Sequence, residues 1–377
     1  MKIRDFGVEI WMNRYENHCE LNLAETCVQS LTVEELLAMA GKTETILSEL
    51  LPMKLTYGAI EGSDRLRRLV AGLYERQKPE NVVATHGTIG ANALVHETLV
   101  EPGDRVISVL PTYQQHYSIP ESYGADVQIL RLTEATGFLP DLDALKRLAT
   151  PGTKLIAINN PNNPTGSLMD RAYLEQIAGI ARECGAWVLC DEVYRGTDQD
   201  GDGSTVSMAD LYEKGISTAS MSKAYSLAGL RLGWIVGPVE LLHAVAVHRD
   251  YNTISVGMLD DHFACIALEN RDKILGRSQQ ITRTNRAILS EWVEGEPLIS
   301  WIAPKSGTTA LLKYDLPMTS EEFCVKLLEA TGVMLTPGSA MEMEGYLRIG
   351  YANGPEIIRE GLKRMSGFLR EQQAAAA

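Results

Sequence analysis

Short apolar segments alternate with helical segments along much of the chain, and this alternation limits the folds that the chain can adopt. Helical spacing fills several of the intervals, as in Arg171–Cys184. Repeated strand–helix units predict an α/β fold in which a mostly parallel sheet is covered by helices on both faces. The predicted strands are Asn81–Thr85, Asp104–Leu110, Ala125–Leu130, Leu155–Asn159, Trp187–Cys190 and Gly215–Ala219.

Polar side chains follow several of these predicted strands. They are His86, Tyr113, Asn163, Asp191 and Lys223. In open α/β sheets, ligands bind at the carboxyl ends of the strands. We therefore expect these residues to lie along one edge of the sheet and to form one site.

The chain has 377 residues, which exceeds the size at which a single hydrophobic core usually stops growing. We predict a large domain over residues 46–275 and a smaller α+β domain over residues 276–377. The N-terminal segment, residues 1–45, is expected to join the smaller domain and to cover the site. The segment from Leu242 to about Leu275 has helical character and is expected to bridge the domains.

The formal net charge of −14 disfavours nucleic acids and anionic membranes as partners. No apolar run approaches the ~20 residues that cross a bilayer. None of the six cysteines lies in a C-x-x-C pair, and the N-terminus carries charges where a secretory signal has its apolar core. These features predict a cytoplasmic protein. No metal site is predicted, because Asp198–Gly203 (DQDGDG) lacks the spacing and terminal glutamate of a calcium loop.

The segment Ser217–Trp234 contains one lysine, Lys223, next to the hydroxyl groups of Ser220 and Ser222, with Arg231 eight residues further on. A neutral lysine amine can form an imine with an aldehyde, and the planar arginine fork suits phosphate. Together they indicate a phosphorylated aldehyde, pyridoxal 5′-phosphate (PLP). The alternative is an ordinary surface lysine on a Gly/Ser loop.

Two other segments suit the same cofactor. At His86–Gly87–Thr88 a predicted strand runs through small residues into a helix, whose free N–H groups can bind a phosphate. Asp191 ends an apolar strand, where its carboxylate can keep the pyridine nitrogen of PLP protonated. The alternative role for Asp191 is that of a turn cap.

Three sequence motifs resemble those of the class I/II aminotransferases, which are PLP enzymes of fold type I. The lysine loop reads S-x-S-K-x-x-x-x-x-G-x-R-x-G, Asp191–Tyr194 reads D-E-x-Y, and Asn159–Gly166 reads NNPNNPTG, similar to the family's N-P-x-N-P-T-G. The resemblance implies a PLP enzyme that acts on an α-amino acid and forms a homodimer with shared sites.

The resemblance also implies roles for individual residues. Lys223, Asp191 and Tyr194 are expected to be catalytic, and Arg348 is expected to pair with the substrate α-carboxylate, although it could instead form a surface ion pair. Tyr57 would reach the cofactor phosphate of the partner subunit. The implied cofactor-binding set is Gly87, Thr88, Ile89, Tyr113, Asn163, Asp191, Tyr194, Ser220, Ser222, Lys223, Arg231 and Tyr57.

The N-terminal part departs from the family pattern. The family has a glycine-containing segment that touches the substrate carboxylate, whereas this chain has LNLAETC with Glu25 and Thr26, preceded by Glu9. Carboxylates beside the substrate would repel acidic side chains and favour a guanidinium or ammonium group. We therefore predict Glu9, Glu25 and Thr26 as substrate-binding residues. The alternative is that the two glutamates are solvated or pair with surface Arg or Lys.

A finer likeness is to the arginine-cyclising PLP enzymes, through the phrases THGTIGANAL, FLPDLDAL, SKAYSLAGLRLGW and HRDYNTIS. It implies that a hydroxyarginine-like substrate loses a side-chain hydroxyl and closes a cyclic guanidine by a β- or γ-elimination. An ordinary aminotransferase with a 2-oxo acid acceptor remains the alternative. A non-catalytic PLP-binding regulator is disfavoured, because every expected cofactor contact is present and no DNA-binding domain is appended.

Overall fold

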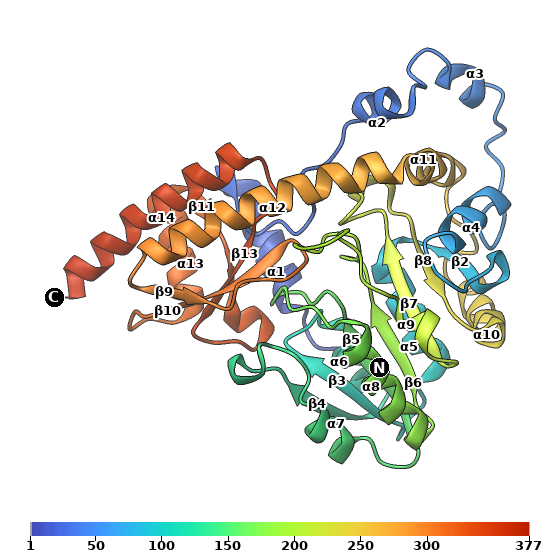
Figure 1. Cartoon of the computed structure of the whole chain (residues 1–377), viewed down its shortest axis with the longest axis horizontal. Coiled ribbons are helices and arrows are strands. Elements are labelled where there is room, and N and C mark those ends of the chain that lie inside the picture. The colour runs from blue at the N-terminus through green and yellow to red at the C-terminus, as the bar shows by residue number, and fades with distance from the viewer. Residues whose placement is uncertain (1, 377) are drawn as a thin grey trace.

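The computed structural model describes residues 2–376 and is built around a seven-stranded sheet (Figure 1). Only β8 runs antiparallel to its neighbours, β2 and β7, so the prediction of a mostly parallel sheet is confirmed. We did not predict β8 from the sequence. The strand order is β2 (Val82–Thr85), β8 (Gly233–Val236), β7 (Gly215–Ser220), β6 (Trp187–Asp191), β5 (Thr153–Asn159), β3 (Arg105–Leu110) and β4 (Asp126–Arg131).

Helices cover both faces of this sheet. On one face α5 (Gly87–Leu99) and α10 (Val239–Asp250) pack on a cluster that contains Leu155 of β5. On the other face α7 (Leu142–Leu148) and α8 (Arg171–Cys184) pack on a cluster that contains Ile156, the next residue of β5. Successive side chains of a strand point to opposite faces, so an uninterrupted apolar strand supplies both cores.

The remaining elements have these bounds: α1 (Gly7–Tyr15), α2 (Val33–Ala40), α3 (Ile46–Leu50), α4 (Asp64–Ala71), α6 (Gln115–Ser122), α9 (Met208–Leu211), α11 (Met258–Glu269), α12 (Arg271–Gly295), α13 (Ser320–Thr331), α14 (Pro355–Ala376), and the 3₁₀ turns Glu16–His18, Pro79–Asn81, Glu134–Thr136, Ala228–Leu230 and Gly338–Met341. The strand register aligns the carboxyl ends, since Asn159 pairs with Asp191 and Asp191 with Thr218. That alignment fixes the edge at which the polar residues collect.

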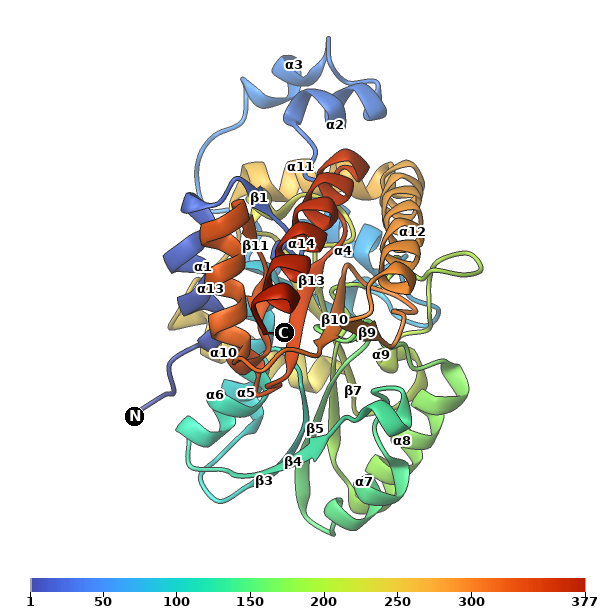
Figure 2. The same ribbon diagram turned by 90° about the vertical axis from the view of Figure 1, so that its left-hand side faces the viewer.

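A smaller antiparallel sheet forms the second part of the fold. It has the order β12 (Thr336–Pro337), β13 (Tyr346–Gly350), β10 (Thr309–Tyr314) and β9 (Ile299–Trp301). Helices α13 and α14 pack beside it, and α12 runs from the large sheet's helices to this region (Figures 1 and 2). The expected smaller α+β part of the fold is therefore present.

The expected bridging helix differs from the observed one. The segment Leu242–Leu275 is not one helix, because the loop 251–257 separates α10 from α11. The 25-residue helix α12 makes the connection instead. Its length allows one end to contact the large sheet's helices while the other reaches α14.

The N-terminal segment contacts both parts of the molecule. Strand β1 (Leu21–Asn22) pairs in parallel with β11 (Val333–Met334), and the indole N–H of Trp11 donates to the carbonyl of Leu335 at 2.8 Å. Helix α2 instead packs on α11, and α2 with α3 projects from the body in both views (Figures 1 and 2). The domain limits at residues 45 and 275 stay a prediction.

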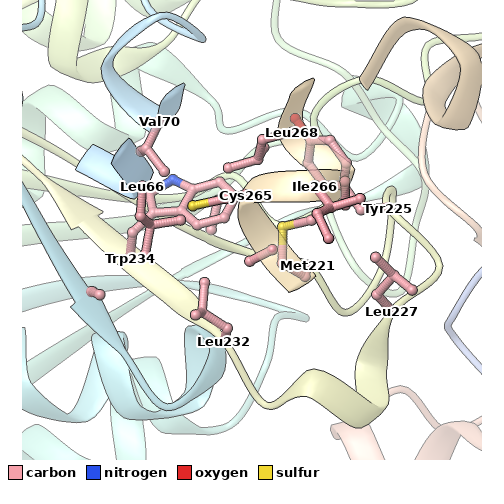
Figure 3. Close-up of a cluster of buried hydrophobic side chains, with 14 of the residues drawn as sticks. Leu66, Val70, Met221, Tyr225, Leu227, Leu232, Trp234, Cys265, Ile266 and Leu268 are labelled. Atoms are coloured by element: carbon pink, nitrogen blue, oxygen red, sulfur yellow. The ribbon is translucent and has the colours of Figure 1, made fainter. Parts of the chain in front are cut away.

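A buried apolar cluster supports the loop that carries Lys223. Met221, Tyr225 and Leu227 insert among Leu66, Trp234, Ile266 and neighbouring side chains (Figure 3). Met221 is fully buried, two residues before the lysine. Burial of the flanking side chains fixes the loop against the sheet edge.

The described residues contain no helix that is long and apolar enough to cross a membrane. Within the same residues no cluster of His, Cys, Asp and Glu could hold a metal ion. The DQDGDG segment is held by Arg283, whose Nη2 donates to the carbonyls of Asp198, Asp200 and Gly201 at 2.9–3.3 Å.

Candidate active site

A cavity of about 320 Å³ opens at the carboxyl edge of the large sheet, between that edge, α1 and the small sheet. Its lining contains all the site residues predicted from the sequence except His86, Gly87 and Tyr57. The predicted residues that line it are Glu9, Glu25, Thr26, Thr88, Ile89, Tyr113, Asn163, Asp191, Tyr194, Ser220, Ser222, Lys223, Arg231 and Arg348. Residues far apart in the sequence therefore converge on one site.

Gly87 and Arg231 form one end of the cavity. Gly87 begins α5 with φ +67°, and a Cβ placed on it would lie 3.0 Å from Nη2 of Arg231. The guanidinium is held there by Nη1, which donates to the carbonyl of Ala228 at 2.9 Å. The free N–H groups of the first turn of α5 and the guanidinium of Arg231 therefore face the same space.

Thr88 provides a direct test of whether this end suits a phosphate. Its Oγ1 is buried and has no hydrogen-bond partner among residues 2–376. A buried hydroxyl without a partner is costly, and a phosphate oxygen in the cradle would satisfy it. Ser222 lies beside the cradle, with its N–H bonded to Ser220 Oγ at 3.2 Å. These residues fit the phosphate of PLP.

Asp191 occupies the floor of the cavity and is held by several donors. Asn92 Nδ2 donates to Oδ2 at 2.8 Å, and the N–H of Val193 donates to Oδ1 at 3.1 Å. Behind it lie two fully buried histidines: His116 Nε2 is 3.5 Å from Oδ2, and His96 Nε2 is 3.4 Å from His116 Nδ1. Burial and the neighbouring His116 hold the pKa of His96 well below its usual value. A carboxylate fixed in this way suits a protonated pyridine nitrogen.

Lys223 meets the N-terminal segment. Its Nζ donates to Thr26 Oγ1 at 2.6 Å and to Cys27 Sγ at 3.4 Å. Burial lowers the pKa of Lys223, but nearby Cys27, Tyr194 and Glu25 outweigh burial and raise it. We did not predict Cys27 as a contact of Lys223, because only its position in the LNLAETC segment distinguishes it in the sequence.

The surroundings of Glu25 favour the ionised form of its carboxyl group. Its Oε1 accepts from the N–H groups of Thr26 and Cys27 at 2.8 and 2.9 Å. Burial opposes ionisation, but the charge of Lys223 and these N–H groups hold the pKa of Glu25 below its usual value. A negative charge therefore lies within the cavity lining close to the amine.

Arg348 is almost completely buried, at 2% exposed, and no carboxylate lies within ion-pair distance of it in the described part of the chain. Its Nη2 donates to the carbonyl of Ala24 and to Thr336 Oγ1, both at 3.1 Å, and Nη1 lies 3.4 Å from Asn163 Oδ1. Its Nε has no partner among the described residues. Burial lowers the pKa of Arg348. A buried guanidinium without a counter-ion is suited to a carboxylate ligand.

Helix α1 closes the opposite wall. Tyr113 donates its hydroxyl proton to Glu9 Oε1 at 2.9 Å, and burial together with Glu9 raises the pKa of Tyr113. Helical spacing then brings Met12, Asn13 and Glu16 into the same lining. We did not predict these three residues. The spacing 9, 12–13 and 16 is a helical face, and that pattern was the available signal.

Three sequence-predicted residues lie outside the lining. Tyr57 is 76% exposed and stands with Leu51, Leu55 and Tyr251 among the exposed large apolar side chains. Gly87 contributes through its contact with Arg231 rather than through the lining itself. His86, expected at the same sheet edge, begins α5 but is not a lining residue. Other lining residues that sequence reasoning missed are Val8, Ala24, Asn92, Asn159, Val193 and Ala228.

Comparison with known proteins agrees with this geometry. Residues 36–363 match the family model described as aminotransferase class I and II. A PLP-dependent aminotransferase from Streptococcus suis 89-1591 has a similar structure, with a TM-score of 0.96 and 44% identity over 99% of each chain. The structure of the PLP-dependent cyclase OrfR is similar too, with a TM-score of 0.91 and 27% identity over 98% of each chain.

Among curated proteins, capreomycidine synthase of Streptomyces vinaceus is 28% identical over 362 residues, which is 95% of this chain and 92% of the relative. The family match covers well over half of the chain, and the cavity has a phosphate cradle, a floor carboxylate and a lysine at the positions that the family motifs imply. The chain therefore belongs to the class I and II aminotransferase family and is a PLP-dependent enzyme.

Proposed function

We propose that this enzyme cyclises a hydroxyarginine-like amino acid. The side-chain hydroxyl leaves with a proton as water, and a guanidine nitrogen forms a new bond to the substrate carbon chain, which gives a cyclic guanidine amino acid. The observation that carries this proposal is the charge pattern of the cavity. The lining combines the positive charge of Arg348 with the carboxylates of Glu9, Glu16 and Glu25.

The two kinds of charge suit the two ends of one substrate. The unpaired guanidinium of Arg348 would bind the α-carboxylate in a bidentate manner. Glu9 has one oxygen bonded to Tyr113 and a second with no bonded partner among the described residues. A guanidinium side chain can bind such a carboxylate by charge-assisted hydrogen bonds, whereas an acidic side chain would be repelled.

The chain's own groups supply the proton chemistry. When bound, PLP supplies an electron sink that weakens the bonds to the substrate α-carbon. The Nζ of Lys223 is expected to remove the α-proton as general base. Thr26 and Cys27 accept hydrogen bonds from Nζ and would fix its position. Tyr194 and Asn163 would bind the ring oxygen, and Tyr113 would stack on the ring.

A second candidate is transamination to a 2-oxo acid. It is favoured by the family match and by the structural likeness to the Streptococcus suis aminotransferase. The same Arg348 would bind the carboxylate of either substrate. The acidic wall then makes a cationic amino acid the preferred amino donor.

One experiment separates the two. The holoenzyme is incubated with 3- or 4-hydroxyarginine without any 2-oxo acid, and separately with arginine and 2-oxoglutarate. A product that has lost one water in the first reaction supports cyclisation. Stoichiometric glutamate in the second, with no dehydrated product in the first, overturns cyclisation in favour of transamination.

We also propose a homodimer in the cytoplasm whose sites are shared. Tyr57 is 76% exposed and Leu55, two residues earlier in the chain, is 82% exposed, as expected of a surface that a second copy covers. Tyr57 of the partner subunit would then reach the cofactor phosphate. Mixing inactive Lys223→Ala and impaired Tyr57→Phe subunits tests this, because heterodimers would regain one intact site and therefore activity. No recovery in proven heterodimers would contradict a shared site.

A further inference from the structure

A second cavity, of about 180 Å³, lies next to the active site and has no role in the chemistry above. Val193 and Ser220 line both cavities, so the two share a wall. The second cavity is lined by the turn after α4, the loop after β6, β7, the lysine loop, β8 and the start of α12. The charged side chains and those with a hydroxyl group in its lining are Tyr74, Glu192, Arg195, Ser204, Ser220, Tyr225 and Arg271.

Arg195 is held at this cavity with its terminal nitrogens free of hydrogen-bond partners among residues 2–376. Its Nε donates to the carbonyl of Thr205 at 2.7 Å, and its guanidinium carbon lies 5.1 Å from the ring centroid of Tyr74. Stacking on an aromatic ring and one backbone contact fix the plane of the guanidinium. A guanidinium that is fixed in one plane and has N–H groups without hydrogen-bond partners is suited to a planar or tetrahedral anion.

The nearest carboxylate does not use these donors. Glu192 is buried and accepts from Ser207 Oγ, the N–H of Met208 and Ser217 Oγ at 2.7–2.9 Å. Tyr74 completes that network, since its hydroxyl lies 3.0 Å from Ser217 Oγ and accepts from the indole N–H of Trp234. The carboxylate of Glu192 is therefore hydrogen-bonded on its own side of the cavity.

Arg271 adds a second positive charge to the lining. Its side chain is 40% exposed, and its closest acidic contact is Asp272 at 3.8 Å, a residue that is itself 96% exposed. Among the charged side chains of the lining two arginines stand against one glutamate. Burial lowers the pKa of Arg195, but nearby groups that include Glu192 and Asp210 outweigh burial and raise it. Asp210 and Asp272 lie outside the lining. The surrounding protein has a formal net charge of −14, so this local excess is opposite in sign to the whole.

We propose that this second cavity is a binding site for a small oxyanion, of the phosphate or carboxylate class, held by Arg195 and Arg271. The site is separate from the cofactor cradle of Gly87 and Arg231 and from the substrate arginine Arg348. The shared wall at Val193 and Ser220 places the bound anion directly behind the segment that carries Lys223.

The test is isothermal titration calorimetry on the holoenzyme, in a buffer without phosphate, with inorganic phosphate in one arm and oxalate in the other. Bound PLP keeps the cofactor cradle filled. The expected result is saturable binding of at least one anion below ~10 mM, and the arm that binds identifies the class. No saturable binding of either anion in that range overturns the proposal.

Two variants locate the binding. Arg271→Gln changes an exposed side chain and is expected to weaken binding about tenfold or more, because a charge-assisted contact is lost. Arg195→Gln is expected to do the same, if it folds. The matched control is Arg359→Gln, an exposed arginine on α14, which should leave the affinity unchanged. Unchanged affinity in Arg271→Gln would place the anion elsewhere, for example at Arg348, and would overturn the proposal.

Discussion

Nζ of Lys223 donates a hydrogen bond to Oγ1 of Thr26 at 2.6 Å. The lysine comes from the loop after β7, whereas the threonine belongs to the N-terminal segment that follows β1. The carbonyl of Thr26 in turn accepts from Thr308 Oγ1 at 2.7 Å, beside β10. The reactive amine thus lies at the junction of the N-terminal segment, the large sheet and the small sheet.

Thr26→Val is expected to lower kcat about tenfold with a smaller change in KM, because the isosteric side chain cannot accept from Nζ and the amine loses a fixed position. Steady-state kinetics with the cyclisation or transamination substrate measures this. Thr26→Ser keeps the hydroxyl and should restore most of the activity. Equal losses in both variants would show that the methyl group, rather than the hydrogen bond, matters.

Lys223→Ala is expected to abolish turnover and the visible absorbance of lysine-bound cofactor. Lys223 is the one lysine among the lining residues that the structure describes, so no other amine there can take its place. Borohydride reduction followed by peptide mass spectrometry should find the cofactor on residue 223 in the wild type and nowhere in the variant. Lys363→Ala, an 81% exposed lysine on α14, is the control and should keep both properties.

Gly87→Ala is expected to weaken PLP binding. The new Cβ would lie 3.0 Å from Arg231 Nη2 and would move the guanidinium out of the phosphate cradle. Gly103→Ala is the matched control, because Gly103 also has positive φ, +86°, but nothing lies within 4 Å of its added Cβ. Both variants should lose about 1 kcal/mol of stability from backbone strain. Cofactor titration by absorbance should separate them, and equal PLP affinities would contradict the cradle.

Glu9→Gln is expected to lower kcat/KM for a guanidinium substrate about tenfold or more, because a charge-assisted hydrogen bond becomes a neutral one. A substrate with a urea group in place of the guanidinium carries no charge and should be affected much less. The ratio of kcat/KM for the two substrates is the measurement. An unchanged ratio would mean that Glu9 serves only as the acceptor for Tyr113.

The stability of the protein is expected to fall as the pH drops below about 6.5, and His96 contributes to this. Its pKa is held well below the usual value by burial, so below pH ~6.5 the unfolded chain binds a proton that the folded chain does not. The free energy of unfolding should therefore fall by up to ~1.4 kcal/mol per pH unit from this group.

Urea unfolding of wild type and His96→Asn between pH 5 and pH 8 tests the assignment. The variant should show a flatter slope below pH 6.5, whatever its absolute stability. His18→Asn, at an exposed position, should keep the wild-type slope. An identical slope in His96→Asn would assign the acid sensitivity to other groups.

Much of the cofactor site follows from local sequence. The lysine loop, the D-E-x-Y end of β6 and the turn into α5 are each continuous segments that follow strands, and parallel strands bring their carboxyl ends to one edge. Asp191, Lys223, Thr88 and Arg231 could therefore be placed together before any coordinates were known. β8 could not, because its first two residues, Gly233 and Trp234, belong to the lysine-loop segment and the strand runs antiparallel to both neighbours.

The sequence by itself determined the α/β sheet, the cofactor and the edge of the sheet at which it binds, because strand period and contiguous motifs are local properties. Only the tertiary structure decided which of the candidate charges share one cavity. Glu9 and Glu16 reach it from α1 and the turn that follows, and Glu25 from the segment after β1, through contacts between residues far apart in the sequence. An acidic residue on an amphipathic helix has the same spacing whether it faces water or a cavity, so packing alone makes the distinction.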